Sequence, residues 1–243
     1  MKSKKIIPVT HDQSDKTKAN VVEKIMNELS RDVDYKQGNY IGLYQILNVL
    51  DAGNFATVYL ARHLVTKDYV AIKNINTVDI SNKTKKFIDR EIKILSIVKH
   101  VHIISLFQVI KTKYKIYMIM EYMHYGSLSK KIKCNKKLDE CVSSYIFYQL
   151  LCAVKYLHAN NIYHRDIKAE NILFVSHHNH IKLCDFGFSR ISSDNEKVKT
   201  YCGSPLYAAP ELFASKGYYP EKVDIWACGV LLYYMISGNF PYF

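Results

Sequence analysis

The sequence predicts an α+β fold in two lobes, a small β-rich lobe followed by a helical one. Short segments rich in β-branched and aromatic residues lie between about residues 40 and 122, and longer segments with helical periodicity follow them. The composition is 49% hydrophobic and 13% aromatic, which is enough to form a core. The length of 243 residues allows one large domain or two small ones.

Residues 1–38 are polar and charged and are expected to form an N-terminal extension. Asn20 and Glu23 have the spacing of a capping box. Four apolar residues then share one helical face: Val22, Ile25, Met26 and Leu29. Two interpretations stay open: a helix that docks on a partner or on the domain, and a marginal helix in a flexible leader.

Five strands are predicted in the small lobe, at residues 43–50, 55–61, 69–75, 104–110 and 115–122. A helix is predicted at about 84–99, because Ile88, Glu91, Ile92 and Leu95 recur at helical spacing. Gly126 marks the crossing to the helical lobe.

A long helix is predicted in the second lobe at about residues 139–160. Its apolar stripe consists of Val142, Ile146, Leu150, Val154 and Leu157. A later helix contains Asp224, Ile225, Trp226 and the run 230–235. It is apolar nearly all round, so we expect burial on every side.

Charge and cysteine content exclude several function classes. The 34 Lys and Arg against 22 Asp and Glu give a net charge of +12. Because the lysines are scattered and no aromatic residues interleave with a basic cluster, a solvated basic surface is favoured over a specific nucleic-acid site. The six cysteines form no close C-x-x-C pair, and no signal peptide precedes them, so reduced thiols in the cytosol or nucleus are expected. The longest apolar run, 229–236, is too short to span a bilayer.

The most specific motif is HRDIKAEN at residues 164–171, followed by DFG at 185–187. Phosphoryl transfer with magnesium-bound ATP needs in-line positioning, cations against the phosphate charge, one carboxylate to accept a hydroxyl proton and another to hold the metal. These two motifs supply an Asp, a Lys, an Asn and a second Asp at suitable spacing.

These motifs, with VAIK at 70–73 and APE at 209–211, resemble those of a eukaryotic protein kinase. The resemblance covers residues 40–243 and implies a kinase domain with a small lobe at about 40–122 and a large lobe at about 123–243. It implies that Asp166 orients the attacking hydroxyl and accepts its proton, and that Lys168 neutralises charge on the moving phosphate. Lys73 would bind the α and β phosphates and pair with Glu91.

The resemblance also implies the ligand-binding residues. Asn171 and Asp185 would hold magnesium through oxygen atoms. The ATP-binding residues would be Leu50, Ala52, Gly53, Asn54, Phe55, Ala56, Val58, Ala71, Lys73, Met120, Glu121, Met123 and Leu173. Among them, Val58, Ala71 and Leu173 would sandwich the adenine ring, Met120 would be the gatekeeper, and Glu121 and Met123 would offer backbone hydrogen bonds to adenine. A stacked internal column would consist of His164, Phe186, Leu95, Leu106 and Asp224.

The glycine-rich loop departs from the family pattern G-x-G-x-x-G-x-V. Only the middle glycine, Gly53, is kept; Asp51 stands at the first position and Ala56 at the third. A carboxylate about 6 Å from a triphosphate costs about 1–3 kcal/mol per unit of opposing charge. We therefore expect ATP binding to be weakened by about tenfold unless Asp51 points outward.

The substrate class follows from Lys168 and from the loop before Ala209, which are similar to serine/threonine kinases rather than tyrosine kinases. The segment VKTYCGSP at 198–205 resembles the AMP-activated-kinase-related group, especially its Nim and microtubule-affinity-regulating branches. A phosphate added to Thr200 by an upstream kinase would pair with Arg165 and Arg190. The alternative is that Thr200 is merely a loop threonine.

Two further departures concern substrates and completeness. Relatives that prefer basic residues upstream of the target often have Glu where this chain has Ser127. Glu170 remains to bind a basic side chain, so we expect only a moderate preference for basic substrates. The helices that follow residue 243 in the family, and an Arg that pairs with the Glu at the position of Glu211, are missing. We therefore expect an incomplete large lobe with exposed apolar surface.

Three functions remain open. The first is an ATP- and magnesium-dependent kinase acting on Ser or Thr of proteins. The second is a pseudokinase that binds nucleotide or a partner without catalysis, favoured by Asp51 and the missing helices. The third is a small-molecule phosphotransferase, which gives no reason for the Thr200 loop.

Overall fold

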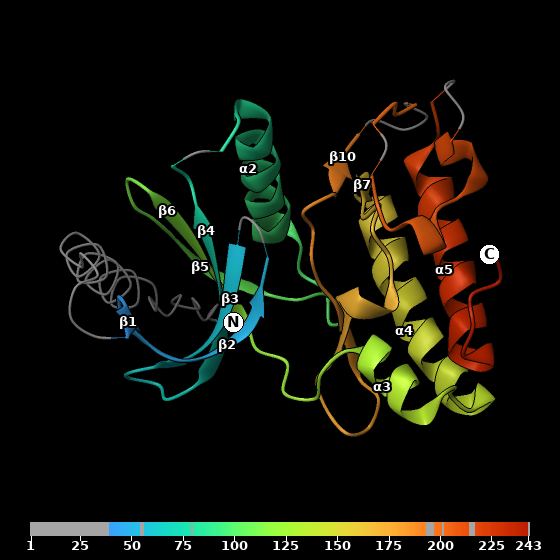
Figure 1. The fold of residues 1–243 in the computed structure, drawn as a ribbon, viewed down its shortest axis with the longest axis horizontal. Helices are drawn as coiled ribbons and strands as arrows, with labels where there is room; N and C mark the ends of the chain where they lie inside the picture. Colours follow the sequence, from blue (N-terminus) through green and yellow to red (C-terminus); the bar gives the residue numbers. More distant parts are fainter. Residues whose placement is uncertain are drawn as a thin grey trace, which may run out of the picture.

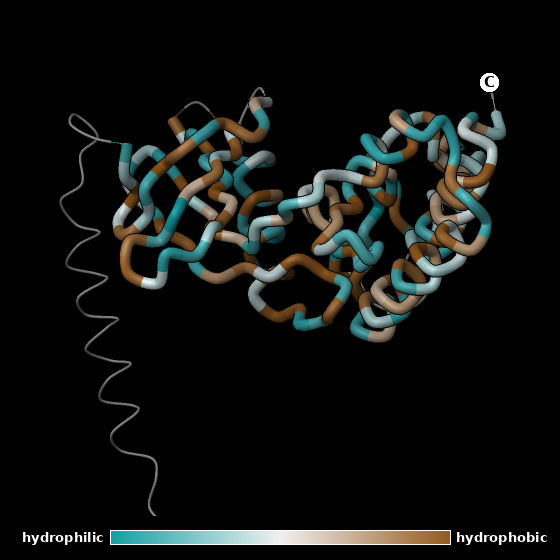
Figure 2. The backbone as a smooth tube through the Cα atoms, turned by 90° about the horizontal axis from the view of Figure 1, so that it is seen from below, coloured by the Kyte–Doolittle hydropathy of each residue, from teal (hydrophilic) through white to brown (hydrophobic). Residues whose placement is uncertain are grey.

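The computed structural model describes residues 39–53, 56–78, 80–192, 197–200, 202–213 and 217–242. The helix predicted near residues 20–29 and the loop residues Asn54 and Phe55 lie outside these ranges. Two lobes lie side by side, a sheet with one helix and a helical lobe (Figure 1). Figure 2 shows from a second direction that the lobes meet along part of their length.

The small lobe is built on a six-stranded antiparallel sheet with the order β1-β2-β3-β4-β6-β5. Its strands are β1 (Tyr40–Ile41), β2 (Tyr44–Ala52), β3 (Ala56–His63), β4 (Tyr69–Asn76), β5 (Leu106–Lys111) and β6 (Lys115–Glu121). Side chains alternate between the two faces of a strand. On one face Val70 and Ile72 join a buried cluster with Tyr117 and Ile119, so the opposite face of β4 presents Lys73 toward α2.

Helix α2 (Asn82–Ile97) packs beside this sheet (Figure 1). Ser81 caps it, because its Oγ accepts a hydrogen bond from the N–H of Thr84 at 3.1 Å. The predicted helix is confirmed but begins and ends two residues earlier. Ile88, Glu91 and Leu95 are buried as expected, whereas Ile92 is only half-buried and Ile94 takes its place in the core.

The large lobe contains three helices and two short strand pairs among the described residues. The helices are α3 (Leu128–Asn135), α4 (Glu140–Ala159) and α5 (Pro220–Ser237). The strand β7 (Ile162–Tyr163) pairs with β10 (Arg190–Ile191), and β8 (Ile172–Phe174) pairs with β9 (Ile181–Leu183). Single 3₁₀ turns lie at Ala169–Asn171, Pro205–Tyr207 and Pro210–Phe213.

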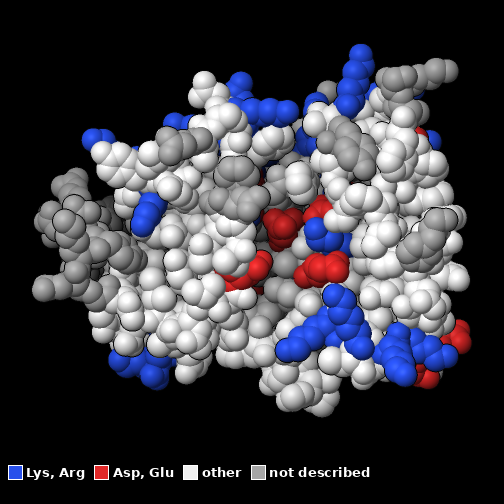
Figure 3. Space-filling model, in the orientation of Figure 1, with Lys and Arg blue, Asp and Glu red and all other residues white. Residues whose placement is uncertain are grey.

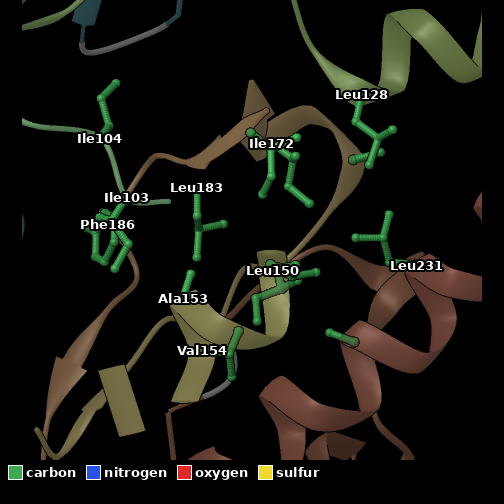
Figure 4. Close-up of a cluster of buried hydrophobic side chains, with 14 of the residues drawn as sticks. Ile103, Ile104, Leu128, Leu150, Ala153, Val154, Ile172, Leu183, Phe186 and Leu231 are labelled. Atoms are coloured by element: carbon green, nitrogen blue, oxygen red, sulfur yellow. The ribbon is translucent and has the colours of Figure 1, made fainter. Parts of the chain in front are cut away.

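The core of the large lobe forms around α4, where the predicted long helix is confirmed. Asp139 caps it by accepting the N–H of Cys141 at 2.8 Å. The predicted stripe is buried at Ile146, Leu150, Val154 and Leu157, and Val142 packs against it half-buried. Figure 4 shows Leu150 and Val154 lying between Leu231 of α5 and the side chains that lead toward Phe186.

Helix α5 buries one face and exposes another, so it has the exposed apolar surface that the sequence predicted rather than burial on every side. One face packs into the core through Ala227, Leu231 and Met235. Within the described part of the chain, Ile225 and Tyr233 of the same helix remain 52% and 50% exposed. The even apolar character therefore marks a helix with one buried face and one apolar face in contact with solvent. None of the described helices combines the length and the hydropathy of a bilayer span.

A second connection joins the lobes besides the linker of residues 122–127. The segment between α2 and β5 bonds to the large lobe through Lys99 N–H to the Tyr156 hydroxyl at 3.1 Å. The N–H of Leu183 donates to His102 O at 2.9 Å, and the N–H of Ile104 donates to Leu183 O at 3.0 Å. These hydrogen bonds hold the segment between α2 and β5 against α4 and β9 of the large lobe.

Candidate active site

Lys73 and Glu91 form the ion pair predicted between the sheet and α2. Lys73 Nζ lies 2.6 Å from Glu91 Oε1 and 3.8 Å from Asp185 Oδ1. Burial lowers the pKa of Lys73, but the carboxylates of Glu91 and Asp185 outweigh it, so the net pKa is raised. The ammonium group therefore stays charged, and it joins residues of both lobes.

For the carboxyl of Glu91, the effect of burial on the pKa outweighs the effect of its charged partner. Glu91 is 4% exposed. Burial raises its pKa above the ordinary value, although the charge and the hydrogen bond of Lys73 act against this. Loss of Lys73 would therefore leave a buried carboxyl without its compensating cation.

The turn that carries Asp166 is held by Asp224 of α5. Arg165 has the left-handed φ of 67°, which a non-glycine residue adopts only when its surroundings support it. Asp224 accepts the backbone N–H of His164 at 2.9 Å and of Arg165 at 2.7 Å. Its Oδ2 also lies 2.9 Å from Nε2 of His158. A carboxylate on a rigid helix thus fixes the backbone one residue before Asp166.

Asp166 is 3% exposed, and both of its carboxylate oxygens are bonded. Oδ2 lies 2.7 Å from Lys168 Nζ and accepts the amide of Asn171 at 3.1 Å. Oδ1 accepts the hydroxyl of Ser204 at 3.0 Å. The structure therefore brings the predicted residues Asp166, Lys168 and Asn171 together.

Ser204 belongs to this group, although the sequence did not single it out as a site residue. Lys168 Nζ donates to Ser204 Oγ at 3.1 Å. The preceding Gly203 has φ 103°, and a Cβ built there would lie 2.8 Å from Arg165 O. Only glycine permits this close approach, which places the loop 202–207 against the turn at Asp166.

Asn171 and Asp185 fit the predicted magnesium site by their chemistry. The Nδ2 of Asn171 is committed to the backbone and side-chain oxygens of Asp166, which leaves its amide oxygen for another partner. Asp185 has the left-handed φ of 61°, and its side chain remains 45% exposed. Amide and carboxylate oxygens suit a hard cation. No cluster of three or more His, Cys, Asp or Glu side chains suited to a metal occurs in the described ranges.

The predicted internal column is present. His164 and Phe186 are 0% exposed, and their rings meet at 4.9 Å in an edge arrangement. Leu95 is buried and Leu106 half-buried, and both belong to the core cluster that contains Phe186. With Asp224 bonded to the backbone of His164, the column runs from α2 through the DFG segment to α5.

The residues predicted to hold adenine lie at the edge where the lobes meet. Strand register places Val58 opposite Lys73, and Ala71 opposite Met120. Met123 follows β6 in the linker, and Leu173 lies on β8, where it bridges to Ser127. Leu50, Ala52 and Ala56 flank Gly53 at the β2–β3 connection. No ligand is present, so their contacts with a nucleotide remain predictions.

Glu121 has an additional structural function that the sequence did not reveal. Its Oε2 lies 2.8 Å from Lys182 Nζ of β9, and its backbone N–H donates to Ser105 O at 3.0 Å. The N–H of Glu121 is therefore unavailable to a ligand, and only its carbonyl remains for the predicted adenine contact. The ion pair fixes the linker to the large lobe.

The side chain of Asp51 bonds locally. Its Oδ1 accepts the N–H of Ala52 at 2.9 Å, and the residue is exposed. A bulge in the β2–β3 register lies between Val49 and Asp51. The carboxylate thus stays next to the backbone that leads into Gly53.

Three arginines lie near one another, Arg165, Arg190 and Arg90, and Arg165 contacts Thr200. Arg165 Nη2 donates to the backbone oxygen of Thr200 at 2.7 Å and to the Tyr218 hydroxyl at 2.6 Å. Its buried Nε has no hydrogen-bond partner in the described part of the chain. The third arginine, Arg90 of α2, was not predicted. Burial lowers its pKa, and the charges of Arg190 and Arg165 lower it further.

Cys184 directly precedes Asp185. Burial raises the pKa of its thiol to about 12, although part of the residue still contacts solvent. In the unfolded chain the thiolate forms near the ordinary pKa of 9.0, so the thiol favours the fold below that pH and this contribution falls as pH rises toward 12. At neutral pH the thiol is therefore protonated.

A family model described as protein kinase domain matches residues 44–243 of this chain. Three curated proteins are similar over 202 residues, which is 83% of the chain. They are the serine/threonine-protein kinase SIK3 homolog of Danio rerio at 42% identity, SIK2 of Gallus gallus at 43% and SIK1 of Mus musculus at 41%. The chain spans 17%, 25% and 26% of their respective lengths.

These comparisons confirm the resemblance inferred from the motifs, including the AMP-activated-kinase-related group. These three relatives carry the name SIK, whereas the segment 198–205 had suggested the Nim and microtubule-affinity-regulating branches of that group.

Proposed function

The chain belongs to the protein kinase family, and from this we propose that it transfers the γ-phosphoryl group of ATP to Ser or Thr hydroxyls of proteins, with magnesium. Support comes from the serine/threonine kinases to which it is 41–43% identical. The single observation that carries the proposal is the bonding of Asp166, whose buried carboxylate is fixed by Lys168, Asn171 and Ser204.

In this proposal Asp166 binds the attacking hydroxyl and accepts its proton late in the transfer. A carboxylate held at both oxygens loses little freedom when it orients a substrate. Lys168, 2.7 Å from the same carboxylate, places a positive charge where the transferred group carries negative charge. Ser204 holds both side chains in this arrangement.

Lys73 would bind the phosphates of ATP, and Glu91 would keep its ammonium group oriented through the 2.6 Å ion pair. Asn171 and Asp185 would hold magnesium, which would offset the negative charge of the phosphates. Val58, Ala71 and Leu173 would sandwich the adenine ring. Glu121, through its carbonyl rather than its N–H, and Met123 would hydrogen-bond to it.

Phosphate transfer is tested with the purified chain, labelled ATP, magnesium and a generic protein substrate. Asp166→Asn should lower kcat by about 10²–10⁴-fold, because the proton acceptor is lost. Asp89→Asn, which changes an exposed α2 carboxylate paired with Lys111 at 3.5 Å, is the matched control and should keep activity. Label on Ser or Thr supports the proposal, label on a small molecule alone supports a small-molecule phosphotransferase, and nucleotide binding without transfer supports a pseudokinase.

We also propose that phosphorylation of Thr200 by an upstream kinase activates the chain. A phosphate there would meet Arg165, Arg190 and Arg90. Its negative charge would offset the repulsion from Arg190 and Arg165, which lowers the pKa of Arg90 in addition to burial. The unpaired Nε of Arg165 would gain an acceptor. Because Arg90 lies directly before Glu91 on α2, the phosphate would couple the Thr200 segment to the Lys73–Glu91 pair.

Activation is tested by treating the chain with an activating kinase and measuring kcat/KM before and after. The treated chain should gain roughly tenfold, as expected from one to three charge-assisted hydrogen bonds. Thr200→Ala should abolish the gain, and Arg90→Gln should reduce it. A treated Thr200→Ala preparation as active as the treated parent would contradict the proposal.

A further inference from the structure

Helix α3 and the turn after it are an exception to the scattered lysines, because they carry a concentrated positive charge. Residues 130–137 contain five lysines and no acidic residue. Lys131 is turned away, since its Nζ contacts Asn179 Oδ1 and lies 4.7 Å from the centre of the Phe174 ring. The other four are exposed and form what we call the lysine surface: Lys130, Lys133, Lys136 and Lys137.

The lysine surface begins beside the residues that position Asp166. Ser129 Oγ donates to Glu170 Oε1 at 3.0 Å. Glu170 directly precedes Asn171, whose amide is bonded to Asp166. The Lys130 side chain runs back along the linker, because a Cβ built at Gly126 would lie 3.8 Å from Lys130 Cδ. Figure 3, oriented as Figure 1, shows basic side chains on the α3 side of the cleft, next to the acidic groups inside it.

This charge is not neutralised within the described part of the chain. No carboxylate there lies within ion-pair distance of Lys130, Lys133, Lys136 or Lys137. Asp139 is the nearest acid along the sequence, but its Oδ1 caps α4 through the N–H of Cys141. Ser127, at the start of α3, offers a hydroxyl that accepts the N–H of Lys130 at 3.3 Å. The exposed Glu140 follows Asp139 at the start of α4, and neither forms an ion pair with the four lysines.

A substrate segment whose hydroxyl reaches Asp166 would lie between the loop 202–207 and the α3 side of the large lobe. The loop 202–207 lies on one side, because Ser204 contacts both Asp166 and Lys168. The α3 side lies beyond Glu170. An extended chain advances about 3.3 Å per residue, and the eight-residue α3 is about 12 Å long. Residues a few positions from the target hydroxyl are therefore within reach of the lysine surface.

We propose that the lysine surface selects protein substrates that carry a run of Asp or Glu on the α3 side of the target Ser or Thr. This inference rests on the proposed function and names its substrate class. It replaces the moderate basic preference that Glu170 suggested, because one carboxylate bonded to Ser129 faces four unpaired cations. Exposed charges contribute modestly one by one, so the selection arises from several of them together.

The test uses peptides with one central serine and a run of three Asp, three Gln or three Arg, placed either before or after that serine. For the parent chain, kcat/KM should be higher for Asp than for Arg in one polarity only. In the Lys130→Glu/Lys133→Glu variant the Asp-to-Arg ratio of kcat/KM should fall roughly five- to tenfold, from the loss of two attractions and the gain of two repulsions. The ratio should also shrink at 0.5 M salt.

The control variant, Lys67→Glu/Lys113→Glu, changes the net charge equally in exposed turns of the small lobe and should keep the parent ratio. An equal preference in both polarities, or the same loss in the control, would show attraction to the overall net charge and overturn the inference. Transfer without charge preference overturns this inference alone, and transfer to no peptide overturns the proposed function. Fluorescence anisotropy of the same labelled peptides measures the preference without any transfer step.

Discussion

Lys73 lies on strand β4 among buried neighbours, where an ammonium group requires compensating charge. The sequence predicted Glu91 as that partner, and the 2.6 Å ion pair confirms it. The resemblance supplied this pairing, because nothing in the local pattern states which of several charged side chains on α2 turns inward. Burial of Glu91 and exposure of Asp89 make that distinction in the structure.

Ser204 and Arg90 show what sequence reasoning missed at this scale. Ser204 lies 38 positions from Asp166, and their hydrogen bond depends on the close approach of Gly203 to Arg165. Arg90 lies in another lobe from Arg165. Neither side chain forms a local pattern, so contacts between distant segments were needed to find them. The nearest sequence signal for Arg90 was its position directly before Glu91.

Asp51 leads to a prediction about nucleotide affinity. Asp51→Asn should tighten ATP binding by up to about tenfold, because it removes a negative charge near the phosphates and keeps a side-chain oxygen for the N–H of Ala52. Isothermal titration calorimetry measures the Kd. Asp68→Asn, an exposed carboxylate in the β3–β4 turn, is the control and should leave the Kd unchanged. An Asp51→Asn chain that binds ATP no better than the parent would refute the electrostatic effect.

Among the elements, the sequence indicated the buried face of α4 but not that of α5. The stripe on α4 specified its buried face, because its apolar residues recur at helical spacing from Val142 to Leu157. Helix α5 carries apolar residues on all of its faces, so the periodicity of its sequence could not indicate which face is buried. What orients α5 is Asp224, which bonds to the backbone of His164 and Arg165 and turns Ile225 outward.

The end of α5 allows a prediction about stability. Gly238 has φ 77°, and a Cβ there would lie 2.1 Å from Lys136 O, so Gly238→Ala should lower the free energy of unfolding by at least about 2 kcal/mol. Gly229→Ala is the matched control within α5. Its Cβ would meet nothing within 4 Å, and it should raise stability by about 0.5–1 kcal/mol. Denaturant unfolding followed by circular dichroism measures both, and equal effects would contradict the packing of Gly238 on Lys136.

At the scale of the whole molecule, the order of strands and helices predicted two lobes, and the structure confirms them. The contacts between the two lobes could not be predicted from the sequence pattern alone. They consist of pairs such as Lys182 with Glu121 and Lys99 with Tyr156, which join residues 61 and 57 positions apart. These contacts hold the sheet and α2 against the turn of Asp166, so Lys73 and Asp185 can face one ligand.

The most direct test of the central claim is the affinity of the purified, folded chain for ATP with and without magnesium. Lys73, Asn171 and Asp185 are predicted to surround one nucleotide and its metal, so magnesium should tighten binding by about tenfold, and Asp185→Asn should remove most of that gain. Circular dichroism shows that each preparation is folded. A folded chain that binds no adenine nucleotide, or binds it equally well without magnesium, would contradict the account.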